Sequence, residues 1–128
     1  MDTEERQILT NLQIAKAHRF LNQAEEMCAM EHWDMAANRF YYACFHAVQG
    51  LFIAKGISGH THSGCITQFS LHFIKTGLIE KTHGSFLARM MQLRQKADYN
   101  CAYEITKEEV RDIVDQSHLF VKMIEDII

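Results

Sequence analysis

The chain has 128 residues, of which 48% are hydrophobic, so it is long enough to bury one core and too short for a second. It contains no proline and few glycines, and its helix-favouring composition excludes a sandwich or barrel and predicts an all-α fold. A formal net charge of -3 argues against general coating of DNA or RNA, which needs many cationic contacts, while leaving room for a small phosphate site.

Targeting signals and stabilising cross-links are not apparent in the sequence. No apolar run approaches the roughly 20 residues of a membrane span, and the N-terminus MDTEERQ is acidic and polar rather than a signal peptide. We therefore expect a soluble, cytoplasmic protein with no membrane association. The four cysteines have no close spacing, and Cys28 and Cys44 fall at core positions of expected helices, so they are interpreted as reduced thiols.

The first two helices are expected to pair as an antiparallel hairpin. Thr3 is the expected N-cap of the first helix, which runs to about Met30 and has an apolar stripe at Ala17, Leu21, Ala24 and Cys28. The second spans Trp33–Lys55 and ends at Gly56, a residue suited to the left-handed position after a helix.

The second helix is apolar over most of its circumference, which is typical of a buried central helix. Arg39, Tyr42 and His46 interrupt it with the spacing i, i+3, i+7, so they share one face. A guanidinium can bind phosphate and an imidazole can move a proton near pH 7, which together suit phosphodiester chemistry. The alternative is an internal polar network where two helices meet.

Three more helices are expected after the turn-rich segment 57–64. Thr61 or Ser63 can cap a third helix that ends at Gly77, and a fourth covers roughly 84–97. The last helix begins with a capping box and has an apolar stripe at Val110, Ile113, Val114, Ser117, Val121 and Ile124. In the capping box, Thr106 precedes Glu109 by three residues.

A second polar cluster lies in RQKADYN, at the end of the fourth helix. Arg94 and Asp98 are one turn apart, and Tyr99 and Asn100 add a phenol and an amide. The alternative to a functional site is an ordinary ion pair that closes the helix. Histidines at 60 and 62 could ligate a metal, but no third ligand stands at a familiar spacing, so we predict neither a metal nor a cofactor and favour helix capping by this loop.

Three segments resemble the HEPN superfamily, the nucleotide-binding domain of higher eukaryotes and prokaryotes: ANRFYYACFHAVQGLF, GHTHSGCITQFSLHFIKTGLI and LRQKADYN. The closest resemblance is to its small stand-alone bacterial and archaeal branch, and it spans nearly the whole chain. It implies a single domain over residues 1–128, folded as an antiparallel up-and-down bundle of four main helices plus a shorter one. It also implies a homodimer.

The resemblance further implies a toxin-like component of a toxin–antitoxin or defence system that is paired with a nucleotidyltransferase. Active members are metal-independent endoribonucleases with an Arg, four to six residues, then a His, and they pair two such motifs across the dimer. Here Arg94 matches the Arg, but Tyr99 stands where the His is expected. Arg39 and His46 reproduce the spacing, although on the central helix.

The resulting catalytic hypothesis combines residues from the second and fourth helices. His46 would take the proton from a ribose 2′-hydroxyl, while Arg94 and Arg39 would hold the phosphate. Asp98 would orient an Arg or His. Side chains that would contact the bound nucleotide or RNA are Tyr42, Tyr99 and Asn100.

The rival hypothesis is a non-catalytic partner domain. In this interpretation the same cluster locks the helices together or binds a nucleotide, and the protein pairs with itself and with a nucleotidyltransferase. The target of that transferase would include Tyr99 or Tyr103. Burial of the cluster away from solvent would favour this interpretation, whereas an open cleft would favour a ligand or RNA site.

Overall fold

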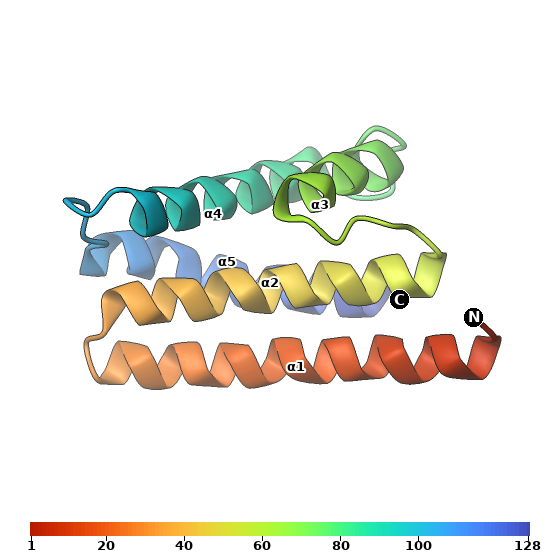
Figure 1. The fold of residues 1–128 in the computed structure, drawn as a ribbon, viewed down its shortest axis with the longest axis horizontal. Helices are drawn as coiled ribbons and strands as arrows, with labels where there is room; N and C mark the ends of the chain where they lie inside the picture. The colour runs from red at the N-terminus through yellow and green to blue at the C-terminus, as the bar shows by residue number, and fades with distance from the viewer.

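A computed structural model describes residues 1–128 and contains helices but no strands. The helices are α1 (Thr3–Ala29), α2 (Trp33–Lys55), α3 (His62–Phe69), the π-helical turn η1 (Ser70–Ile74), α4 (Lys81–Tyr99) and α5 (Lys107–Ile127). Figure 1 shows α1 and α2 running antiparallel along the length of the molecule, as the sequence predicts. The all-α fold and the bundle with one shorter helix, α3, are both confirmed.

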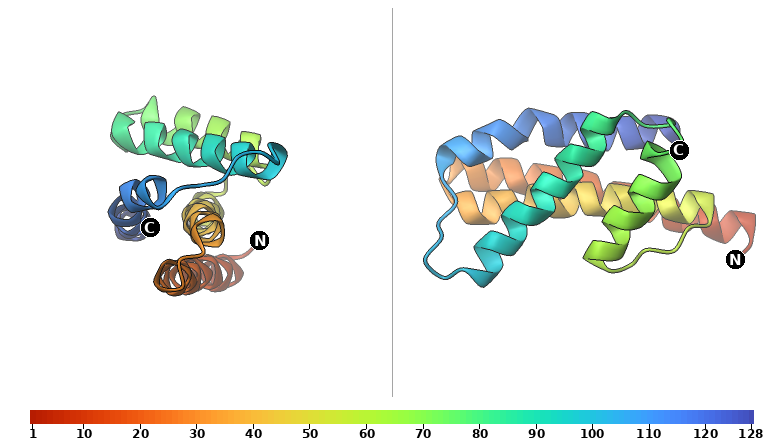
Figure 2. Two further views of the ribbon diagram at one scale, coloured as in Figure 1. Left: turned by 90° about the vertical axis from the view of Figure 1, so that its left-hand side faces the viewer. Right: turned by 90° about the horizontal axis from the view of Figure 1, so that it is seen from above.

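Helix α2 is the centre of the bundle and contacts α1, α3, α4 and α5. Figure 2 shows α2 and α5 side by side between α1 on one side and α3 with α4 on the other. It also shows α3 and α4 crossing over α2 and α5 at a steep angle. Since α2 is enclosed in this way, it has more buried residues than any other helix, which explains its nearly continuous apolar sequence.

Local capping signals account for several helix ends. Gly56 takes the left-handed conformation after α2, with φ 70°, and the Thr61 hydroxyl accepts a hydrogen bond from the Gly64 N–H at the start of α3. The capping box of Thr106 and Glu109 is present at the start of α5. Each of these ends was predicted because a cap needs only residues adjacent in sequence.

Two predicted helix starts differ from the structure. The N-cap of α1 is Asp2 rather than Thr3, because the Asp2 carboxylate accepts a hydrogen bond of 2.7 Å from the Glu5 N–H. Helix α4 begins at Lys81, earlier than the expected Gly84. Gly84 lies inside the helix because α4 packs closely there: a Cβ on Gly84 would stand 3.0 Å from Cγ1 of Ile74.

The buried face of α5 is wider than the predicted apolar stripe. Val110, Ile113, Ser117, Val121 and Ile124 are buried as predicted, whereas Val114 is only partly buried. Phe120, which the stripe omits, is fully buried, with its ring centroid 5.8 Å from those of Phe69 and Phe86. Because α5 packs against several helices, it buries a broader arc than one stripe describes.

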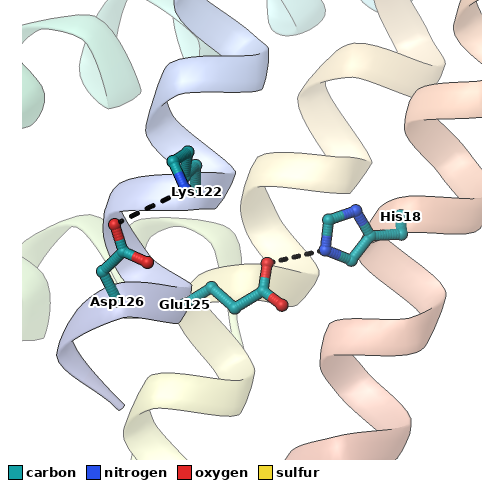
Figure 3. Close-up of polar contacts among 4 residues, drawn as sticks. All are labelled: His18, Lys122, Glu125 and Asp126. Atoms are coloured by element: carbon teal, nitrogen blue, oxygen red, sulfur yellow. Dashed lines mark hydrogen bonds and ion pairs between the residues drawn. The ribbon is translucent and has the colours of Figure 1, made fainter.

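Exposed polar contacts join α1 to α5 along their length. His18 Nε2 lies 2.7 Å from Oε1 of Glu125, as drawn in Figure 3, and His118 of α5 makes a similar contact of 2.8 Å with Glu25 of α1. All four side chains are solvent-exposed, so each contact adds at most about 1 kcal/mol to stability. No helix in this bundle is both long enough and apolar enough to cross a membrane.

Candidate functional site

A cavity of about 680 Å³ opens where α1, the first turns of α2 and the second half of α4 meet. It has apolar walls that include Met27, Met90 and Leu93, and polar walls that include Arg39, Arg94, Asp98, Asn38, Gln23, Glu26 and Asp34. Its volume is within the range of small-molecule sites. The carboxylate of Asp34 also accepts a hydrogen bond of 3.0 Å from the N–H of Ile105, so it tethers the α4–α5 loop to the wall of the cavity.

Arg94 is a largely buried charged group at this cavity, with 13% of its side chain accessible. Its Nη2 lies 3.2 Å from Oδ2 of Asp98, and its guanidinium lies over the rings of Tyr41 and Tyr42, 5.6 and 5.9 Å from their centroids. Its Nε–H is buried without a hydrogen-bond partner. Since Arg94 lines the cavity, its guanidinium can attract an anionic oxygen that binds there.

Arg39 borders the same cavity from α2. Its guanidinium carbon lies 4.4 Å from the centroid of Phe20 on α1, and its Nε and Nη2 donate to Oδ1 of Asn38 at 3.1 and 2.7 Å. A longer bond of 3.5 Å reaches Gln23. The structure therefore brings Arg39, Arg94 and Asp98 to one cavity, although the sequence places them far apart.

His46 points elsewhere. Its Nδ1 lies 2.8 Å from Oε1 of Gln13 on α1, and its ring packs edge-on against Phe20 and Phe45. It neither lines the cavity nor hydrogen-bonds to Arg94. Its geometry is that of the alternative interpretation, a polar network where two helices meet.

The environment of His46 disfavours its charged form. Burial, followed by the positive charges of Lys16, Arg19 and Arg39, lowers the pKa of His46 to about 4. The imidazole is therefore neutral in the folded protein at pH 7, whereas the unfolded chain protonates it near pH 6.5. Protonation thus favours the unfolded state in the interval between these two pKa values.

Measuring the free energy of unfolding as a function of pH tests whether His46 is neutral in the folded protein. As pH falls from about 6.5 towards 4, the unfolded state binds a proton at His46 that the folded state does not, so this residue contributes a progressive loss of stability. A His46→Gln variant is expected to lose less free energy of unfolding over that interval than wild type. Urea unfolding at several pH values measures it, with His72→Gln, at an exposed histidine, as the matched control. Identical pH profiles for wild type and His46→Gln would contradict the assignment.

The imidazole that shares its surroundings with Arg94 is His62, the first residue of α3. Its Nδ1 lies 2.6 Å from Oη of Tyr41, and its ring lies 5.8 Å from that of Tyr42 and 4.9 Å from that of Phe45. Burial, and then the Arg94 charge, lowers the pKa of His62, while Asp98 opposes the shift. Sequence reasoning treated this histidine as part of a capping loop, because its approach to α4 depends on tertiary packing.

Of the predicted binding residues, Tyr42 lies next to Arg94, whereas Tyr99 and Asn100 lie at the C-terminal end of α4. Tyr42 packs under the Arg94 guanidinium. Tyr99 is 80% exposed at the last turn of α4, and Asn100 uses its Oδ1 to accept a hydrogen bond from the Ala102 N–H. Neither lines the cavity. The Tyr103 hydroxyl donates to Glu109, and this bond raises the pKa of Tyr103 to about 12.

The assembled groups suit anion binding and proton transfer. Two guanidiniums face one cavity, and a phenol-bound imidazole lies next to one of them. Arginine is always charged at neutral pH and binds phosphate through paired N–H donors, whereas a neutral imidazole can accept a proton. No three His, Cys, Asp or Glu side chains are grouped so that they could hold a metal ion.

Comparison with known proteins places the chain in a family. The HEPN domain matches residues 11–127. A UPF0332 protein of Thermotoga maritima is 36% identical over 113 residues, covering 88% of this chain and 86% of that protein. Two proteins of Methanocaldococcus jannaschii are named "Putative toxin MJ0142" and "Putative toxin MJ0605". The first is 33% identical over an alignment that covers 84% of this chain and 74% of its own length. The second is 36% identical over an alignment that covers 70% of this chain and 66% of its own length. The chain therefore belongs to the HEPN domain family.

Proposed function

We propose that this protein is the toxin-like component of a toxin–antitoxin or defence system, paired with a nucleotidyltransferase, and that it cleaves RNA without a metal ion. Two relatives have names that describe them as toxins, which supports the first part. The resemblance to metal-independent endoribonucleases of this superfamily supports the second. RNA is the substrate and no cofactor takes part.

The observation that carries the proposal is the environment of the Arg94 guanidinium. Its side chain is only 13% accessible, packs over two phenol rings, has Asp98 as a carboxylate partner, and lines a cavity that Arg39 also lines. Cleavage of a phosphodiester places extra negative charge on the phosphate oxygens in the transition state. Preorganised guanidiniums stabilise such charge without the reorganisation that water would need.

A homodimer belongs to this proposal, since active superfamily members pair their motifs across two subunits. The cavity here is open on one side, so a second subunit could cover it and exclude water from the reacting phosphate. A C2 dimer would bring two such cavities to symmetry-related positions.

The direct test is cleavage of single-stranded RNA by the purified wild-type protein in excess EDTA. We expect fragments ending in 2′,3′-cyclic phosphate and 5′-hydroxyl groups, because the 2′-hydroxyl is the nucleophile. A DNA oligonucleotide of the same sequence has no 2′-hydroxyl and is expected to stay intact. Intact RNA after incubation with nuclease-free wild-type protein, alone or freed from its partner, would refute the catalytic part of the proposal.

A non-catalytic nucleotide-binding partner domain is the second candidate. Tyr99 stands where active relatives have a histidine, and its exposed phenol is open to modification by a nucleotidyltransferase. The cavity volume also suits a mononucleotide, with apolar walls for a base and Arg39 and Arg94 for phosphate. Calorimetric binding of a nucleotide that depends on Arg94, in a protein that leaves RNA intact, would favour this candidate.

A further inference from the structure

We propose that His62, held in place by Tyr41, is the general base that takes the proton from the ribose 2′-hydroxyl at the Arg94 site. The inference rests on the proposed RNA cleavage and names the proton acceptor for it. His62 is a catalytic residue in this proposal, because it contacts the reacting hydroxyl. Tyr41 acts through His62 and is a positioning residue.

The first step of the argument is proximity. His62 and Arg94 come from α3 and α4, and both lie against the same two rings, those of Tyr41 and Tyr42 on α2. The Tyr41 centroid is 5.6 Å from the His62 centroid and 5.6 Å from the Arg94 guanidinium carbon. The Arg94 charge also acts on the His62 imidazole, so we expect the ribose next to a phosphate on this guanidinium to approach the imidazole.

The second step is orientation. Nδ1 of His62 is engaged by the Tyr41 hydroxyl at 2.6 Å, while Nε2 has no hydrogen-bond partner within the chain. The residue is only partly buried. When Nδ1–H donates to the Tyr41 oxygen, the lone pair of Nε2 is free to accept a proton, and the ring cannot rotate away without losing that bond.

The third step is the protonation state. The charged and titratable groups that face His62 are Tyr41 and Tyr42 from α2 and Arg94 and Asp98 from α4. Burial and the nearby guanidinium keep the pKa of this imidazole below its ordinary value, so it is neutral at pH 7. Activity through this base is therefore retained above the lowered pKa and lost as pH falls through it.

The cleavage reaction balances with His62 as the proton acceptor and water as the proton donor. The 2′-oxygen forms a bond to phosphorus as its proton moves to Nε2 of His62. The P–O5′ bond breaks, and the departing 5′-oxygen takes a proton from water. The imidazolium then keeps its Nδ1–H bond to Tyr41 and returns its extra proton to solvent. The products are a 2′,3′-cyclic phosphate and a 5′-hydroxyl.

Other candidate bases are less well placed. His46 is bound to Gln13 and packs against Phe20, both on α1, and it has no hydrogen bond to Arg94. Tyr99, at the motif position where a histidine is expected, points into solvent at the end of α4. His62 alone combines a fixed ring, a free nitrogen and the neighbourhood of Arg94.

The test compares RNA cleavage by wild type, His62→Ala and Tyr41→Phe in the full-length protein. We expect His62→Ala to be about 100-fold slower and to regain activity with added free imidazole, which a structural loss would not do. Tyr41→Phe removes only the hydroxyl, and we expect a loss of about tenfold with an unchanged affinity for RNA. His72→Ala, at an exposed histidine just after α3, is the matched control and is expected to equal wild type.

The outcomes separate this inference from the proposed function. No cleavage by wild type would refute the function itself. Cleavage by wild type that Arg94→Ala abolishes and His62→Ala leaves unchanged would refute the role of His62 while the function stands. A loss in His62→Ala that imidazole fails to rescue, with an acidic limb of the pH–rate profile identical to wild type, would also refute it.

Discussion

Arg94→Ala is expected to cleave RNA roughly 100- to 1,000-fold more slowly than wild type, which corresponds to about 2.7 to 4 kcal/mol of lost transition-state stabilisation. The guanidinium is held between Asp98 and two phenol rings, so it is already oriented before a phosphate arrives. Arg94 also lines the cavity, so its charge is available to a phosphate bound there. Initial rates of cleavage in EDTA, with excess enzyme, measure the effect.

The Arg94→Lys variant separates the effect of the positive charge on the cleavage rate from the effect of the planar guanidinium donors. Lysine keeps the positive charge but lacks the planar set of donors, so we expect a loss intermediate between wild type and alanine. Arg89→Ala is the matched control on α4, because Arg89 lies over Phe86 and donates to Gln116 on α5, away from the cavity. Arg94→Ala that is folded by circular dichroism yet cleaves at the wild-type rate would contradict the assignment.

Phe120→Ala is expected to lower the free energy of unfolding by about 3 to 5 kcal/mol. The ring is fully buried on α5, where it meets Phe69 of α3 and Phe86 and His83 of α4. Its removal leaves a cavity that several helices would have to move to fill. Since small domains have only about 5 to 15 kcal/mol of stability, this single change removes a large part of it.

The neighbouring residue offers a matched control for this measurement. Leu119 is 62% exposed, so Leu119→Ala is expected to change stability by less than about 0.5 kcal/mol. Urea unfolding of both variants at equal protein concentration gives the comparison. A similar small effect in both variants would show that α5 does not depend on Phe120 for its docking onto α3 and α4.

Much of the fold could be predicted because its signals are local. Gly56 after α2 and the capping box at Thr106 mark helix ends through residues adjacent in the chain. The sequence predicts that α4 starts at Gly84, whereas the helix starts at Lys81. Glycine usually disfavours a helix interior, but here it allows α4 to pack closely on Ile74. Such packing is a tertiary property that periodicity does not reveal.

The site was predictable in part for the same reason. Arg39, Tyr42 and His46 do share a face of α2, but the spacing could not show that two of them pack on Phe20 of α1. The approach of His62 to Arg94 depends on how α3 and α4 cross α2, as Figure 2 shows. No pattern along the chain encodes that crossing, so the sequence could not indicate that His62 lies near Arg94.

The carboxylate of Asp34 has two neighbours at once: the interior of the cavity and the amide of Ile105. A ligand that contacts Asp34 in the cavity would therefore act on the hydrogen bond that holds the α4–α5 loop. If the ligand strengthens or weakens this bond, thermodynamic reciprocity requires that a protein whose binding to residues 100–106 does the same change the affinity of the cavity for the ligand. Such a protein would act on the cavity without contacting Arg39 or Arg94.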